Sequence, residues 1–209
     1  MTGHFVDRDR EMQEMEQNLV PDKAPRGRKI HILHGMGGIG KTQLAIAHAR
    51  KHQKTYSAIV WVNGDSTDTV LQSLAAFSRH VGIRGVPDPR VQQAPDMEAE
   101  AEAVLRWLAL ERNQRWLIIL DNVDRNVIAG EENTQAYDVM SFMPPADYGS
   151  ILVTSRLPAL GEIGASTEVG RLSSEQALEL LSDRSGLQPL STGMLQVLPV
   201  EVSKRLHPH

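Results

Sequence analysis

The strongest constraint on this chain is the segment Gly35-Met36-Gly37-Gly38-Ile39-Gly40-Lys41-Thr42, which matches the pattern G-x-x-x-x-G-K-[ST] at every fixed position. An apolar stretch precedes it and a helix-forming stretch follows it, as the pattern requires. Glycine lets the backbone turn tightly, so that N–H groups point at phosphate oxygens, and the following helix adds its dipole. We therefore expect a site for a purine nucleotide, ADP or ATP with Mg²⁺, rather than a chance glycine-rich turn.

Two residues at the end of this segment have specific chemistry. Lys41 is expected to bridge the β- and γ-phosphates, and the hydroxyl of Thr42 is expected to bind Mg²⁺. The other residues of this segment and its flank that we expect to contact the nucleotide are four glycines and two of their neighbours: Gly35, Gly37, Gly38, Ile39, Gly40 and Gln43.

A carboxylate for the metal is expected from a second apolar strand. Residues 117–120 are Leu-Ile-Ile-Leu, and Asp121 follows them at the carboxyl end, where α/β sheets bind ligands. Asp121 would hold Mg²⁺ directly or through water, although Asp-Asn is also a common turn pair. Asn122 can hydrogen-bond a water molecule but cannot take its proton, and Asp124 is at best a partial substitute. We therefore expect slow ATP hydrolysis or none.

Arg156 is the third residue, beside Lys41 and Asp121, to which we assign a catalytic role. It follows a continuous apolar stretch, 150–154, which predicts a buried strand. If the strands have their usual order, Arg156 lies next to the two strand ends that carry the other ligands. Its forked donors suit a terminal phosphate, and the alternative is a surface arginine at a strand end.

Strand and helix patterns alternate along the chain. The predicted strands are 29–34, 58–62, 116–120, 150–154 and 167–169, and the predicted helices are 8–20, 42–54, 67–81, 96–112, 135–143 and 173–184. This alternation predicts an α/β fold, an open and mostly parallel sheet with helices on both faces. With 41% hydrophobic but 4% aromatic residues, its core must be aliphatic. We divide the chain into a lead-in at 1–28, a nucleotide-binding core at 29–186 and a tail of uncertain structure at 187–209.

Composition argues against several other classes of function. A formal charge of −4 does not favour a nucleic-acid surface, and we interpret Arg26, Arg28 and Lys29 as the solvated start of a strand. The N-terminus has no apolar signal region, no apolar stretch is long enough to span a membrane, and there is no cysteine. We expect a cytoplasmic protein with neither a nucleic-acid nor a membrane partner. His48 and His52 are interpreted as surface residues rather than zinc ligands.

Together these segments resemble the NB-ARC module of the STAND ATPases, which occurs in plant and fungal NOD-like receptors and in animal apoptosis scaffolds. The resemblance spans about residues 4–185 and rests on segments in the family's order and spacing, at 4–9, 35–45, 117–124 and 149–156. It implies a P-loop NTPase fold in which Phe5, Val6 and Arg8 contact the adenine and Arg156 reads the γ-phosphate. The alternatives are that Phe5 and Val6 are core residues and that Arg8 is a solvated charge at a helix start.

The resemblance also implies a signalling switch whose output is its nucleotide state. ADP would hold a closed form and ATP would favour an open, oligomerising one. The sequence departs from the family where Asp7 replaces a glycine and Asn122 replaces a second acid. We further expect the family's downstream helical and winged-helix domains to be lacking. A Mg²⁺-dependent ATPase enzyme and a non-binding scaffold are the alternative functions, and protein partners or self-association are left open.

Overall fold

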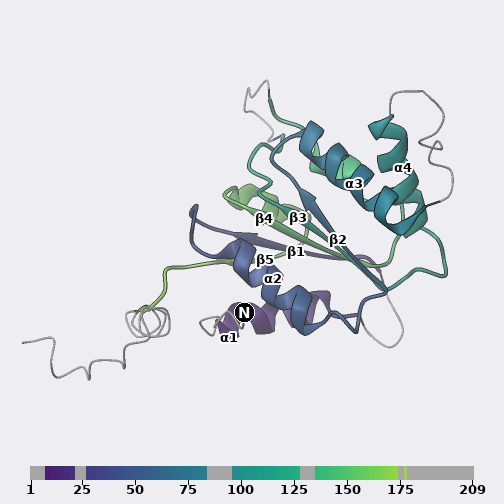
Figure 1. Cartoon of the computed structure of the whole chain (residues 1–209). Coiled ribbons are helices and arrows are strands. Elements are labelled where there is room, and N and C mark those ends of the chain that lie inside the picture. Colours follow the sequence, from purple (N-terminus) through teal and green to yellow (C-terminus); the bar gives the residue numbers. More distant parts are fainter. Residues whose placement is uncertain (1–7, 22–26, 84–95, 128–134, 174–176, 178–209) are drawn as a thin grey trace, which may run out of the picture. The chain divides into compact units, whose positions relative to one another are not determined.

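The computed structural model describes residues 8–21, 27–83, 96–127, 135–173 and 177. Residues Arg8–Arg171 form one compact unit, which contains the sheet and the helices labelled in Figure 1. A second unit comprises Met1–Asp7 and Leu172–His209. Phe5, Val6 and nearly all of the predicted helix 173–184 therefore lie outside the described residues.

A five-stranded parallel sheet organises the larger unit. Its strands are β1 (Lys29–His34), β2 (Ala58–Asn63), β3 (Trp116–Asp121), β4 (Ser150–Ser155) and β5 (Ala165–Glu168). Their order across the sheet is β2-β3-β4-β1-β5, and every neighbouring pair is parallel. Strand β4 thus separates β3 from β1, so that the carboxyl ends of these three strands lie side by side.

Helices cover both faces of this sheet. They are α1 (Asp9–Leu19), α2 (Lys41–Lys51), α3 (Thr67–Val81) and α4 (Met97–Leu108), with short 3₁₀ helices η1 (Val139–Phe142) and η2 (Pro158–Ile163). Figure 1 shows α1 and α2 on one face and α3 and α4 on the other. The predicted α/β fold with an open parallel sheet and helices on both faces is therefore confirmed. Within the part of the chain that the structure describes, no helix combines the length and the apolar character needed to cross a bilayer.

Burial explains why β3 is continuously apolar. Ile118 and Leu120 belong to the hydrophobic cluster that includes residues of α3 and α4. Leu117 and Ile119 are equally buried, and because successive side chains alternate across a strand, they point to the opposite face. A strand covered on both sides needs apolar residues at every position, as parallel sheets generally do.

The aromatic ring of Trp116 fixes the turn that leads into β4. The ring is fully buried, and its indole N–H donates to the carbonyl of Leu108 at 2.8 Å. Gly149 packs against this ring so closely that an added Cβ would lie 2.2 Å from it. Gly149 also has a φ of 83°, in the left-handed region, so both space and backbone conformation require glycine here.

The predicted helix 135–143 is wrong. Only Val139–Phe142 forms a short 3₁₀ turn. Upstream, the backbone of Tyr137 pairs with the segment after β3, since its N–H donates to Arg125 and its carbonyl accepts from Val127. The backbone N–H of Met140 then donates to the carboxylate of Asp138. These local bonds use the backbone groups that a helix would need. Helices α2 and α4 also end earlier than their predicted limits at 54 and 112.

His48 is not the surface residue that the sequence predicts. It is completely buried, and its Nε2 lies 3.2 Å from the hydroxyl of Tyr56. The reason is that α1 packs on α2 and covers this face of the helix. His52, one turn on, is partly exposed, with its Nε2 3.1 Å from Glu16.

Candidate nucleotide-binding site

The glycine-rich loop between β1 and α2 has a backbone that side chains would not tolerate. Gly35, Gly38 and Gly40 all have positive φ, at 144°, 73° and 106°. An added Cβ at Gly35 would lie 2.6 Å from the carbonyl oxygen of Val169. At Gly38 and Gly40 nothing lies within 4 Å of such an atom, so the loop presents bare backbone to open space. A glycine loop of this kind before a helix can present its backbone N–H groups to an anion such as phosphate.

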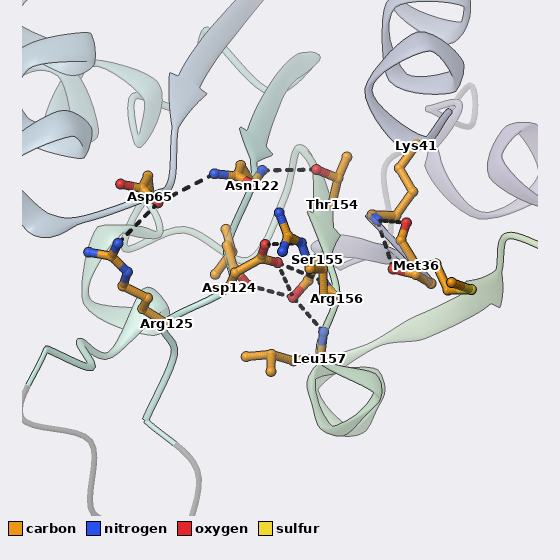
Figure 2. A network of polar contacts seen from close by, with 12 residues as sticks. Met36, Lys41, Asp65, Asn122, Asp124, Arg125, Thr154, Ser155, Arg156 and Leu157 are labelled. Carbon is orange, nitrogen blue, oxygen red and sulfur yellow. Dashed lines mark hydrogen bonds and ion pairs between the residues drawn. The ribbon is translucent and has the colours of Figure 1, made fainter. Parts of the chain in front are cut away.

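Lys41 lies folded back along this loop. Its Nζ donates to the carbonyl of Gly35 at 2.8 Å and to that of Met36 at 2.9 Å (Figure 2). Burial lowers the pKa of Lys41; Asp124 and Asp121 oppose this shift, and Arg156 adds to it. The ammonium is thus held at the loop by weak, neutral acceptors that a phosphate can replace.

Three oxygen-bearing side chains meet next to the loop. The hydroxyl of Thr42, at the start of α2, donates to Asp121 Oδ1 at 2.9 Å. The hydroxyl of Thr154, on β4, donates to the same carboxylate oxygen at 2.6 Å. Asp121 ends β3, so the strand order explains how the three elements converge. A carboxylate with a neighbouring hydroxyl is the kind of oxygen donor set that Mg²⁺ prefers, so these residues fit that ion.

Asn122 follows Asp121 in a left-handed conformation, with a φ of 68°. Asparagine tolerates this conformation better than most residues. Its N–H donates to the hydroxyl of Thr154 at 2.9 Å, and its side-chain amide is 3.5 Å from Asp65. The position next to the metal-side carboxylate therefore carries an amide, which cannot act as a general base.

Asp124, the other acid near this strand end, is paired with Arg156. The Arg156 Nε lies 2.8 Å from Asp124 Oδ2, and the backbone N–H of Arg156 donates to Oδ1 at 2.6 Å. Figure 2 shows the carboxylate turned toward this arginine. Both oxygens of the carboxylate therefore already contact the residue expected to read a terminal phosphate.

A cavity of about 260 Å³ lies in front of the loop. It is lined by residues of the loop, α2 and the ends of β3 and β4: Gly37, Gly38, Ile39, Gly40, Lys41, Thr42, Gln43, Asn122, Asp124, Thr154 and Arg156. The cavity lining thus includes most of the residues predicted to bind nucleotide. Asp121 does not line the cavity, but it accepts a hydrogen bond from Thr42, which does. Gly35 packs behind the loop, against Val169.

Arg8 reaches the loop from outside the cavity. Its guanidinium is buried and donates to the carbonyl of Ile39 at 3.0 Å and to that of Gly170 at 2.9 Å. The alternative of a solvated charge is therefore excluded. Phe5 and Val6, the other residues of the expected adenine contact, lie outside the described residues.

Thr154 is a site residue that the sequence did not single out. It occupies the penultimate position of β4, is buried, and binds both Asp121 and Asn122. A threonine interrupting the apolar run of a buried strand is the signal that could have identified it, because such a hydroxyl needs a partner.

The fold and site define a class. A parallel sheet with a glycine-rich loop and lysine after β1 and an acid at the end of β3 is a P-loop NTPase fold. The structure of Cdc6p from Pyrobaculum aerophilum has the same fold, with a TM-score of 0.58 at 13% sequence identity. That similarity covers 88% of this chain and 52% of Cdc6p.

Within this class the family is also established. The family model described as NB-ARC domain matches residues 8–190, and the chain therefore belongs to the NB-ARC family. A protein of Hyaloscypha variabilis, described as a nucleotide-binding leucine-rich repeat (NLR)-like protein, is 22% identical over 200 residues. The match covers 92% of this chain and 19% of that relative, so the chain spans about a fifth of its length.

Proposed function

We propose that this chain is the ADP- or ATP-binding module of a NOD-like receptor type signalling switch, with slow ATP hydrolysis or none. The observation that carries the proposal is the hydrogen bond of 2.9 Å from the hydroxyl of Thr42 to the carboxylate of Asp121. This bond lies beside a loop whose glycines have positive φ. A phosphate-binding backbone next to a metal-binding oxygen pair suits a nucleotide that carries Mg²⁺.

Each residue then has a defined task. The loop from Gly35 to Gly40 and the start of α2 hold the phosphates through backbone N–H groups. Lys41 would exchange its carbonyl partners for phosphate oxygens, and Thr42 with Asp121 would hold the metal. When bound, Mg²⁺ would neutralise part of the charge of the nucleotide phosphates.

Weak hydrolysis is supported by the residues directly after Asp121. Efficient hydrolysis needs a group that orients water and takes its proton, and Asn122 cannot take a proton. Asp124 is engaged with Arg156 at 2.8 Å. The bound nucleotide would therefore persist, which suits a switch whose output is its nucleotide state. The NLR-like description of the fungal relative is in keeping with this role.

Two measurements on the purified protein test this proposal. Denaturation followed by chromatography is expected to release ADP or ATP, and phosphate release in the presence of Mg·ATP is expected to stay near background. Steady phosphate release that collapses in Lys41→Ala would instead support an active ATPase. Absence of any bound nucleotide, together with no thermal shift on adding Mg·ADP, would support a scaffold that does not bind.

A further inference from the structure

The pairing of Asp124 with Arg156 has a consequence for which nucleotide the site prefers. The carboxylate makes two separate contacts with the arginine, one to Nε at 2.8 Å and one to the backbone N–H at 2.6 Å. Both residues line the cavity in front of the phosphate-binding loop. The Asp124 carboxylate therefore already pairs with the Arg156 guanidinium in the cavity where phosphates are expected.

The guanidinium also lies directly against the loop. An added Cβ at Gly37 would sit 3.3 Å from both Cζ and Nε of Arg156. Gly37 thus leaves the space that allows the arginine to lie across the loop. The ion pair is part of the wall of the cavity rather than a surface contact remote from it.

The two partners differ in how readily they can move. The Asp124 side chain is 19% exposed and is fixed by the backbone of the next strand end, whereas the Arg156 side chain is 64% exposed. If the pair opens, the arginine is therefore the group that moves. Asp124 remains in place as a fixed negative charge facing the cavity.

We propose that Asp124 is a specificity-determining residue that biases the site toward nucleoside diphosphates. This inference rests on the proposed function, because it concerns the same nucleotide site. A diphosphate leaves the Asp124–Arg156 pair intact. A triphosphate adds a further anionic group, which must either draw Arg156 away and leave the Asp124 carboxylate unpaired, or bind without the arginine. Both alternatives weaken triphosphate binding relative to diphosphate binding.

The size of the bias follows from the exposure of the pair. Partly exposed ion pairs contribute modestly, so the expected change in preference is about three- to fivefold. Asp124→Asn is the appropriate variant, since its side-chain oxygen still accepts the backbone N–H of Arg156 while the charge is removed. Asp65→Asn removes the same charge on the other side of Asn122 and serves as the matched control.

The experiment measures dissociation constants for Mg·ADP and for the Mg complex of β,γ-imido-ATP by titration calorimetry. The compared quantity is the dissociation constant for the triphosphate divided by that for the diphosphate. In Asp124→Asn this ratio is expected to fall about three- to fivefold, and in Asp65→Asn it stays unchanged. Because both ligands are measured on the same preparation, a partial loss of folded protein cancels in the ratio.

A second pair of variants tests whether the effect acts through Arg156. In an Arg156→Ala background, Asp124→Asn is expected to change the ratio much less, as a double-mutant cycle requires for coupled residues. An unchanged ratio in Asp124→Asn overturns the inference, and so does an equal change with and without Arg156. Absence of binding by the wild-type protein would instead overturn the proposed function.

Discussion

At the residue scale, two arginines contact the phosphate-binding loop in different ways. Arg8 is 7% exposed and binds the carbonyls of Ile39 and Gly170, which lie far apart in the sequence. Arg156 is 64% exposed and lies over Gly37. The buried arginine ties the loop to the segment after β5, whereas the exposed one is available to a ligand.

Replacing Arg8 is expected to destabilise the protein. Arg8→Ala leaves two carbonyls without their charged donor, and hydrogen bonds of this kind contribute about 1.5–3 kcal/mol. We therefore expect the free energy of unfolding to fall by about 2–3 kcal/mol in a urea titration. Arg10→Ala, which removes an arginine that is 70% exposed, should change it by less than about 0.5 kcal/mol. Equal effects of the two substitutions would contradict the assigned role of Arg8.

At the element scale, local patterns predicted the sheet but not all of its connections. The central strands β3 and β4 contain continuous apolar runs, such as Leu117–Leu120 in β3, and such runs can be recognised without information on distant contacts. The segment before η1 fails as a helix because Tyr137 pairs with residues after β3. Likewise, His48 is buried only because α1 packs over α2. Both outcomes depend on contacts between elements, which sequence periodicity does not encode.

The turn into β4 offers a test at this scale. Gly149→Ala places a methyl group 2.2 Å from the ring of Trp116 and also forces alanine to a φ of 83°. Overpacking and left-handed strain together are expected to lower the free energy of unfolding by roughly 3 kcal/mol or more.

Gly82→Ala is the matched control for this substitution. Gly82 has a φ of 65°, but nothing lies within 4 Å of an added Cβ. Only the backbone strain applies, so the expected loss is about 1 kcal/mol. If urea titrations gave the same loss for both variants, crowding against Trp116 would not be what requires glycine at 149.

At the scale of the whole molecule, the site is assembled by strand order. The glycine loop and Asp121 are recognisable in the sequence because a local motif and a strand end carry them. The bond from Thr154 to Asp121 and the pairing of Asp124 with Arg156 exist because β4 lies next to β3 in the sheet. The position of Arg156 at the end of a strand makes it a candidate site residue from sequence alone. Its partner Asp124 could not be predicted without knowing the order of the strands in the sheet.

Buried histidines predict how the stability of the molecule depends on pH. Burial lowers the pKa of His31 from 6.5 to about 4, and burial together with His52 lowers that of His48 to about 4. His31 is bound to Thr167, whose hydroxyl donates to Glu14. Between pH 6.5 and about 4 the unfolded chain binds protons that the folded protein does not, so stability falls as pH falls through this window.

Urea unfolding at a series of pH values checks this dependence. The unfolding midpoint is expected to be constant above neutral pH and to decrease steadily on acidification toward pH 5. A variant carrying His31→Gln and His48→Gln should be less stable at neutral pH but show a flatter profile. A wild-type midpoint that is unchanged or higher at pH 5 would contradict the assignment of neutral, buried histidines.

The central claim is that the loop from Gly35 to Thr42 binds an adenine nucleotide, and calorimetric titration with Mg·ADP tests it most directly. Lys41→Ala removes the loop cation, and Lys51→Ala removes the same charge at the far end of α2, where Lys51 pairs with Glu16. Saturable one-site binding is predicted for the wild type and Lys51→Ala, with affinity weaker by about tenfold or more in Lys41→Ala. No binding to the wild type, or equal affinity in Lys41→Ala, would contradict the account.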